Sequence, residues 1–159
     1  MKEKTSSKVL NGLVIVGIIL TIFALIGTPL GLTALLKTSR ISNMVWILTA
    51  FIYACAVPYL IALFKFKRIC KLLTSENSFS PFISKDFQGI AICAFTEAFI
   101  YTLSNILLYV LFDFYLYAMT ILPLIVVVFV AVTLGFLFLI MSSIFKRAAE
   151  IKEENDLIF

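Results

Sequence analysis

The sequence predicts an all-α membrane protein with four transmembrane helices, arranged as two antiparallel hairpins with both termini in the cytoplasm and an amphipathic cytoplasmic connector between them. Three observations carry this prediction. Hydrophobic residues make up 62% of the 159 residues and charged residues only 14%, whereas a soluble domain has about 25% charged residues. Long apolar segments alternate with short charged ones. Lysine and arginine are concentrated in alternate loops, on one side of the resulting topology.

Four apolar segments are long enough to cross the hydrocarbon core of a bilayer, which takes about 20 helical residues. They cover residues 10–36, 44–64, 89–112 and 118–143. A membrane-spanning strand would show about ten residues of alternating polarity, and no segment has that pattern. Helices are the backbone solution that remains, because the bilayer core offers no hydrogen-bond partners. The first segment is too long for the apolar region of a secretory signal, so we expect it to stay attached.

The orientation follows from the positions of the basic residues. Eleven lysines and arginines lie before the first span, between the second and third spans, or after the fourth, and two lie in the first loop. Because cytoplasmic loops retain basic residues, both termini are expected to be cytoplasmic. A short turn at Asp113 would pair the third span with the fourth. The fourth span either tilts or begins near Pro123, which suits a first helical turn.

The connector, residues 65–88, is the first of two charged cytoplasmic segments. In its first part, residues 65–73, apolar residues recur at helical spacing among four cations, which predicts an interfacial amphipathic helix that contacts the membrane surface or a partner; the cations are Lys65, Lys67, Arg68 and Lys71. A simple positive-inside anchor is the alternative reading. Ser80 and Pro81 suit the N-cap and first turn of the following helix.

The cytoplasmic tail, residues 146–159, is the second charged segment. Its candidate contact residues are acidic or carry an amide: Glu153, Glu154, Asn155 and Asp156. They lie on the same membrane face as the basic connector, so the tail can dock there by charge, or it can be a solvated helix end with weak exposed pairs. The apolar end, Leu157 to Phe159, favours burial in this protein or in a partner.

Glu97 is the first candidate for a functional site, because it is the only ionisable side chain within the predicted spans and an intramembrane charge is costly. Tyr101, Ser104 and Asn105 follow on the same helical stripe. No lysine or arginine lies in a span. The carboxyl is then protonated and bonded to a hydroxyl such as that of Tyr101, wetted from the cytoplasm, or bound to a cationic ligand. The alternative is a structural role between helices.

Several classes of function have no support in the residues. The chain contains no histidine, no nucleophile elbow, no phosphate-binding loop and no paired intramembrane carboxylates, so we expect no enzyme and no catalytic residues. Its three cysteines lack metal-ligand spacing, so no metal and no cofactor are predicted. The cations lie between apolar runs, which argues against direct nucleic-acid binding.

Two polar stretches carry a resemblance to a known family. Glu76-Asn77-Ser78-Phe79-Ser80 and the closing stretch from Ile151 to Ile158 resemble the bacterial membrane proteins catalogued as domain of unknown function 2975, and the similarity extends over nearly the whole chain. Members look like four-span proteins of this size, and their genes often neighbour a small helix-turn-helix regulator. This sequence departs at Ile158, where a threonine commonly follows the leucine. The resemblance implies regulation and no particular chemistry.

These observations predict a regulatory or interaction protein of the bacterial cytoplasmic membrane, whose partners are the lipid bilayer and a cytoplasmic helix-turn-helix regulator. Glu97 and its polar stripe would be the sensing element. The alternative is a small transporter or channel subunit, or a toxin-immunity protein. A chain of this size would have to form a homo-oligomer to enclose a pathway.

Overall fold

The computed structural model describes residues 2–35, 42–74, 81–112 and 117–158, with side chains from Val9 to Ala34, Val45 to Leu73, Pro81 to Val110 and Ile121 to Asn155. The described residues form four helices: α1 (Lys2–Leu35), α2 (Ser42–Thr74), α3 (Pro81–Phe112) and α4 (Tyr117–Ile158). Each contains an apolar stretch that is long enough to cross a membrane. This confirms the prediction of an all-α protein with four helices of membrane-spanning length.

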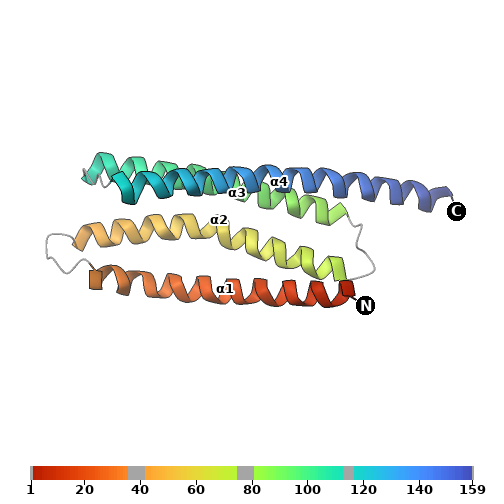
Figure 1. Cartoon of the computed structure of the whole chain (residues 1–159), viewed down its shortest axis with the longest axis horizontal. Coiled ribbons are helices and arrows are strands. Elements are labelled where there is room, and N and C mark those ends of the chain that lie inside the picture. Colours follow the sequence, from red (N-terminus) through yellow and green to blue (C-terminus); the bar gives the residue numbers. More distant parts are fainter. Residues whose placement is uncertain (1, 36–41, 75–80, 113–116, 159) are drawn as a thin grey trace.

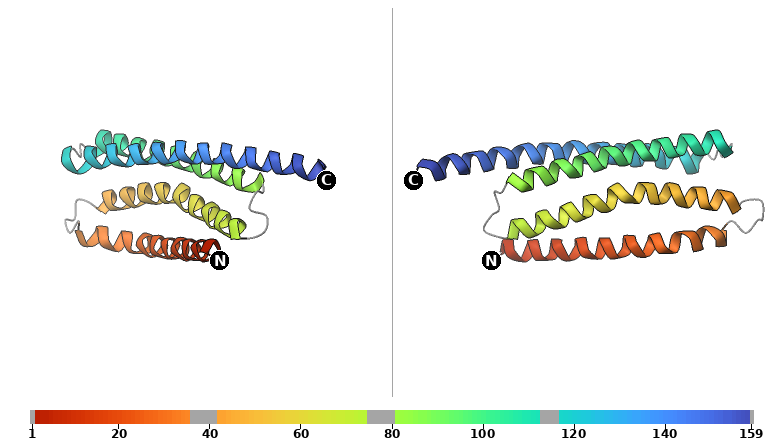
Figure 2. Two further views of the ribbon diagram at one scale, coloured as in Figure 1. Left: turned by 45° about the vertical axis from the view of Figure 1, so that its right-hand side comes forward. Right: turned by 180° about the vertical axis from the view of Figure 1, so that it is seen from behind.

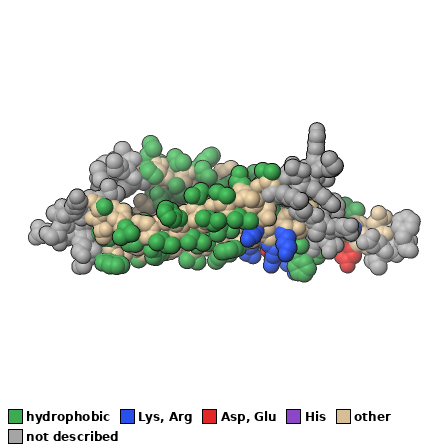
Figure 3. Space-filling view, turned by 90° about the horizontal axis from the view of Figure 1, so that it is seen from below, with side chains coloured by type: hydrophobic (Ala, Val, Ile, Leu, Met, Phe, Trp, Pro, Cys, Tyr) green, Lys and Arg blue, Asp and Glu red, His purple; other side chains and the backbone are tan. Residues whose placement is uncertain are grey.

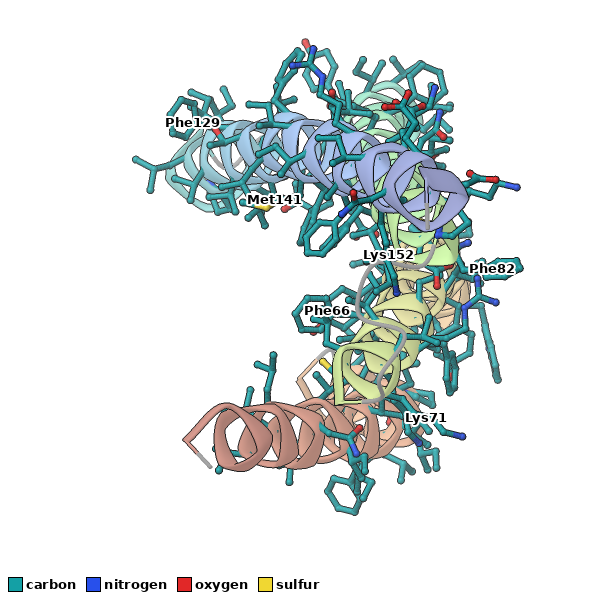
Figure 4. The ribbon with its side chains drawn as sticks, turned by 90° about the vertical axis from the view of Figure 1, so that its right-hand side faces the viewer. Phe66, Lys71, Phe82, Phe129, Met141 and Lys152 are labelled. Atoms are coloured by element: carbon teal, nitrogen blue, oxygen red, sulfur yellow. The ribbon has the colours of Figure 1, made fainter. Side chains whose placement is uncertain are left out.

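The helices pack in chain order, α1 on α2, α2 on α3 and α3 on α4 (Figure 1). Among the described residues, the backbones of α1 and α4 do not approach each other. The four helices therefore form an open arc, which is seen end-on in Figure 4 and from two further sides in Figure 2. The start of α1 and the end of α4 lie at the same end of the molecule.

The connector differs from the separate interfacial helix that the sequence predicts. α2 continues without interruption to Thr74, so residues 65–74 are its final turns. No proline or glycine follows Pro58 within α2, and nothing else in the sequence interrupts the hydrogen-bonded ladder there. The basic residues of this segment are therefore carried on the end of a membrane-length helix.

The other helix ends can be compared with the predicted ones. α3 begins at Pro81, as expected, although Ser80, the expected cap, lies outside the described residues. α4 begins at Tyr117, so Pro123 lies inside the helix and does not start it. A proline is tolerated inside a membrane helix because neighbouring groups can satisfy the carbonyl that it leaves free. The predicted turn at Asp113 also lies outside the described residues.

A hydrogen bond joins α1 to α2 at such a proline. Pro29 lies inside α1 and has no N–H group, so the carbonyl of Leu25, four residues earlier, lacks its usual helical donor. The hydroxyl of Tyr53 in α2 donates to this carbonyl at 3.1 Å. Nearer the other end, Val14 and Ile18 of α1 form a buried cluster with Cys70 of α2. The two contacts fix α1 along both halves of α2.

Polar and close contacts join α3 to α4. The hydroxyl of Ser84 donates to the carbonyl of Ser142 at 2.8 Å, and the hydroxyl of Ser142 donates to the carbonyl of Ser84 at 2.8 Å. Farther along, Gly135 of α4 lies against the ring of Phe95, and a Cβ atom at Gly135 would come within 2.8 Å of that ring. Small residues thus let the two helices approach closely.

An aromatic cluster connects α2, α3 and α4 at the end where the chain termini lie. Phe87 of α3 is buried and stacks on Phe138 of α4, with ring centroids 5.9 Å apart. Phe66 of α2 meets the same Phe138 ring edge-on at 6.4 Å. Ile69 and Ile83 complete the buried part of this cluster. These rings set the distance between α2 and α4.

The close approach at Gly135 generates a first prediction. Gly135→Ala should lower the stability of the protein by about 1–3 kcal/mol relative to Gly27→Ala, because the added methyl group displaces the Phe95 ring. Gly27 is the matched control, since it also lies within a helix and nothing lies within 4 Å of a Cβ atom there. Both substitutions replace glycine by alanine within a helix, so the favourable change in helix propensity is the same for both. Thermal unfolding of both variants in one detergent measures the difference, and equal midpoints would contradict the packing argument.

Candidate functional site

A groove with a volume of about 530 Å³ lies between α2, α3 and α4. Its walls are apolar side chains from all three helices, including Pro58, Ile90, Val130 and Phe138, together with one carboxyl group, that of Glu97. Figure 4 shows Phe66 of α2 and Met141 of α4 on the concave side of the arc, whereas Phe82 points outward. None of the described side chains of α1, residues 9–34, lines the groove.

Glu97 is half-buried in the wall that α3 contributes. Its Oε2 atom is inaccessible to solvent and has no hydrogen-bond partner among the described residues. No hydrogen bond from a described residue, Tyr101 included, reaches this atom. No lysine or arginine is among the residues that line the groove. The carboxyl group in the groove wall thus keeps one buried oxygen unsatisfied in apolar surroundings, where such an atom carries a large desolvation cost.

The other members of the predicted polar stripe do not line the groove. Ser104 is buried and lies close to the thiol of Cys55 in α2. The amide of Asn105 donates to the backbone carbonyl of Tyr101 at 2.9 Å, within its own helix. Tyr101 is half-buried. Of the four residues of the stripe, Glu97 therefore lies in the groove wall, and the other three lie outside the groove.

Asp86 is the ionisable residue that sequence reasoning missed. Its side chain has no exposed surface, and both carboxylate oxygens accept hydrogen bonds from the guanidinium group of Arg68 on α2. The ammonium group of Lys65 lies 3.7 Å from the same carboxylate. Lys65 crosses α3 at Gly89, where a Cβ atom would lie 2.6 Å from Nζ. Two of the four cations at the start of the connector, Lys65 and Arg68, thus pair with a carboxylate of the same chain.

The remaining charges of the candidate contact residues face outward. Lys67 and Lys71 are exposed at the end of α2, and Glu153, Glu154 and Asn155 are exposed on the last turns of α4. The side chain of Asp156 lies outside the described residues. One tail pair, Lys146 with Glu150, has 3.9 Å between the charged atoms. Among the described side chains, no ion pair joins the tail to the connector.

The arrangement at Asp86 generates a second prediction. Asp86→Asn should destabilise the protein by about 2 kcal/mol, because an amide cannot accept two charge-assisted bonds from Arg68 and the buried group is left unsatisfied. Glu150→Gln is the matched control: it makes the same change in an exposed pair, and such pairs contribute little. Thermal unfolding in detergent measures both. A D86N midpoint equal to that of E150Q would show that the buried pair does not hold α2 to α3.

Of the comparisons with known proteins, one gives a match. Neither the curated proteins nor the solved structures give a match. A family described as "Protein of unknown function (DUF2975)" matches residues 34–158, which is well over half of the chain. The matched segment begins where α1 ends, so it contains α2, α3, α4 and every residue that lines the groove. The chain belongs to the DUF2975 family.

Proposed function

We propose that this protein is a regulatory or interaction protein of the bacterial cytoplasmic membrane. Its two antiparallel hairpins, α1 with α2 and α3 with α4, cross the bilayer with both termini in the cytoplasm. The charged cytoplasmic end binds a soluble helix-turn-helix regulator, and Glu97 in the groove senses a ligand. The extended, acidic end of α4 is the observation that carries this proposal.

The register of α3 on α4 places this acidic end clear of the rest of the protein. Because Ser84 pairs with Ser142 on an antiparallel neighbour, the start of α3 at Pro81 is level with Phe145. Residues 146–158 extend α4 past that level, over about 20 Å at 1.5 Å per residue. Figure 1 shows α4 projecting beyond the other helices. A helix end that extends past the described start of α3 is available to a partner.

Charge divides along this end: Lys146 and Arg147 come first and acidic side chains predominate after them, so its tip favours a basic partner. Glu150, Glu153 and Glu154 are all exposed, and their carboxylates attract a positively charged surface. DNA-binding proteins carry such surfaces. In Figure 3 the lysine and arginine side chains gather toward the same end of the molecule, beyond a long hydrophobic surface. The acidic helix and the basic end of α2 together offer a partner two surfaces of opposite sign.

The orientation generates a third prediction. A green fluorescent protein fused after Phe159 should fluoresce, and alkaline phosphatase inserted within residues 113–116 should be active, because the basic segments stay in the cytoplasm. Fluorescence and phosphatase activity in whole cells measure the two positions. Phosphatase activity from a fusion after Phe159 would overturn the proposed orientation.

The acidic end generates a fourth prediction. Reversing two charges, Glu153→Lys with Glu154→Lys, should reduce recovery of a helix-turn-helix protein by about tenfold when the membrane protein is purified in mild detergent, because the basic partner is then repelled. The control exchanges Lys146 and Glu150, which keeps their pair and the net charge. Mass spectrometry of the purified complex measures recovery.

Two results would contradict this function. If no DNA-binding protein accompanies the wild type, or if the charge-reversed variant recovers it equally well, the regulatory proposal fails. Deletion of residues 146–159 separates it from the alternative class. Partner capture should be lost on deletion, whereas a transporter or toxin-immunity protein should keep its transport or its protection.

A further inference from the structure

We propose that the groove binds an organic cation with an apolar body, whose charge pairs with Glu97. This inference names the class of ligand for the sensing role proposed for Glu97. It rests on that role for the purpose of binding, and the binding itself is independent of it. Binding can be measured on the protein alone, without any cytoplasmic partner.

The unsatisfied carboxyl oxygen is the first step of the argument. Oε2 of Glu97 is buried and has no hydrogen-bond partner within the described part of the chain. Lys65, which lies against Gly89 about two turns before Glu97, is already paired with Asp86 at 3.7 Å. Asp86 lies eleven residues before Glu97 on α3, which separates the two carboxylates by about 16 Å along the helix axis. The protein therefore supplies a counter-ion to Asp86 and leaves Glu97 for a ligand.

The groove walls determine what kind of cation fits. Of the described residues that line the 530 Å³ groove, Glu97 alone is charged, and the remaining side chains are almost all aliphatic or aromatic. A metal ion needs several oxygen, nitrogen or sulfur ligands, and the described residues contain no group of three acidic, histidine or cysteine side chains that could hold one. A cation attached to an apolar body satisfies both the carboxylate and the walls.

Aromatic side chains add to the attraction for a cation. Phe66 and Phe138 line the groove toward its cytoplasmic end, and Tyr59 lines it from α2. Ring faces attract organic cations, and they do so more strongly where water is excluded. The same rings provide apolar contact for the body of the ligand. Charge and apolar surface thus act on one molecule.

The open arc gives such a ligand a route. Within the described residues, α1 packs on α2 alone and contributes no side chain to the groove. Amphipathic cations concentrate in the membrane because their apolar bodies partition into hydrocarbon and their charge is attracted to anionic headgroups. A ligand of this class can reach the groove from within the bilayer, between α2 and α4. A strictly water-soluble cation lacks the apolar body that the walls select.

Tetraphenylphosphonium and tetraphenylborate are suitable probes, because they share a shape and carry opposite charges. The purified full-length protein in lipid nanodiscs should bind radiolabelled tetraphenylphosphonium saturably and should not bind tetraphenylborate. Glu97→Gln should weaken the binding of the cation at least about tenfold, since the pairing charge is lost while the side-chain size is kept. Glu150→Gln, on the exposed end of α4, is the control and should bind as the wild type does.

A second variant fills the groove and keeps the carboxyl group. Val130 lines the groove and is 47% exposed, so Val130→Trp can occupy the space without displacing a buried side chain. It should also weaken binding at least about tenfold, while thermal unfolding confirms that each variant is folded. Equal binding of the two probes would overturn the proposal, as would binding by E97Q within twofold of the wild type or no saturable binding by the wild type. If the wild-type protein captures no DNA-binding partner but still binds the cation, the proposed regulation is refuted and this inference stands.

Discussion

The attachment of α3 to α2 depends on a carboxylate that has no exposed surface. Asp86 would be too costly to bury alone, and it is stable there because Arg68 donates to both of its oxygens and Lys65 adds a second positive charge. The pair joins the end of α2 to the beginning of α3. Ile69 and Ile83 are fully buried beside it. This contact fixes α2 against α3 at one end, and α4 is held there by its own contacts with α3. The groove between the three helices depends on that arrangement.

Two carboxylates on the same helix therefore have different roles. Asp86 is satisfied on both oxygens by side chains of a neighbouring helix, whereas Glu97 has a buried oxygen with no partner among the described residues. Basic side chains reach Asp86 because they are carried by the end of α2 that lies against it. None is carried on the apolar walls deeper in the protein. The distribution of cations along α2 thus decides which carboxylate is structural and which can meet a ligand.

Most of the helical architecture could be predicted from sequence, because hydropathy and helix length are local properties. Glu97 could also be singled out, since one acidic residue in an apolar segment is visible in the sequence alone. The pairing of Arg68 with Asp86 depends on how α2 and α3 lie against each other. The sequence alone therefore indicates only that both residues belong to the connector. The polar stripe was predicted from helical periodicity. Periodicity does not show that Asn105 bonds its own backbone or that Ser104 meets Cys55.

The hydrogen bond at Pro29 also constrains how α1 can move. Rotation of α1 about its axis, or a shift by one turn, would separate Tyr53 from the carbonyl of Leu25 and leave that carbonyl unsatisfied in hydrocarbon, at a cost of several kcal/mol. Tilting about that bond would open the buried cluster of Val14, Ile18 and Cys70, which holds the other half of α1. α1 and α2 therefore respond to the thickness and curvature of the surrounding lipid as one packed unit with a constant register.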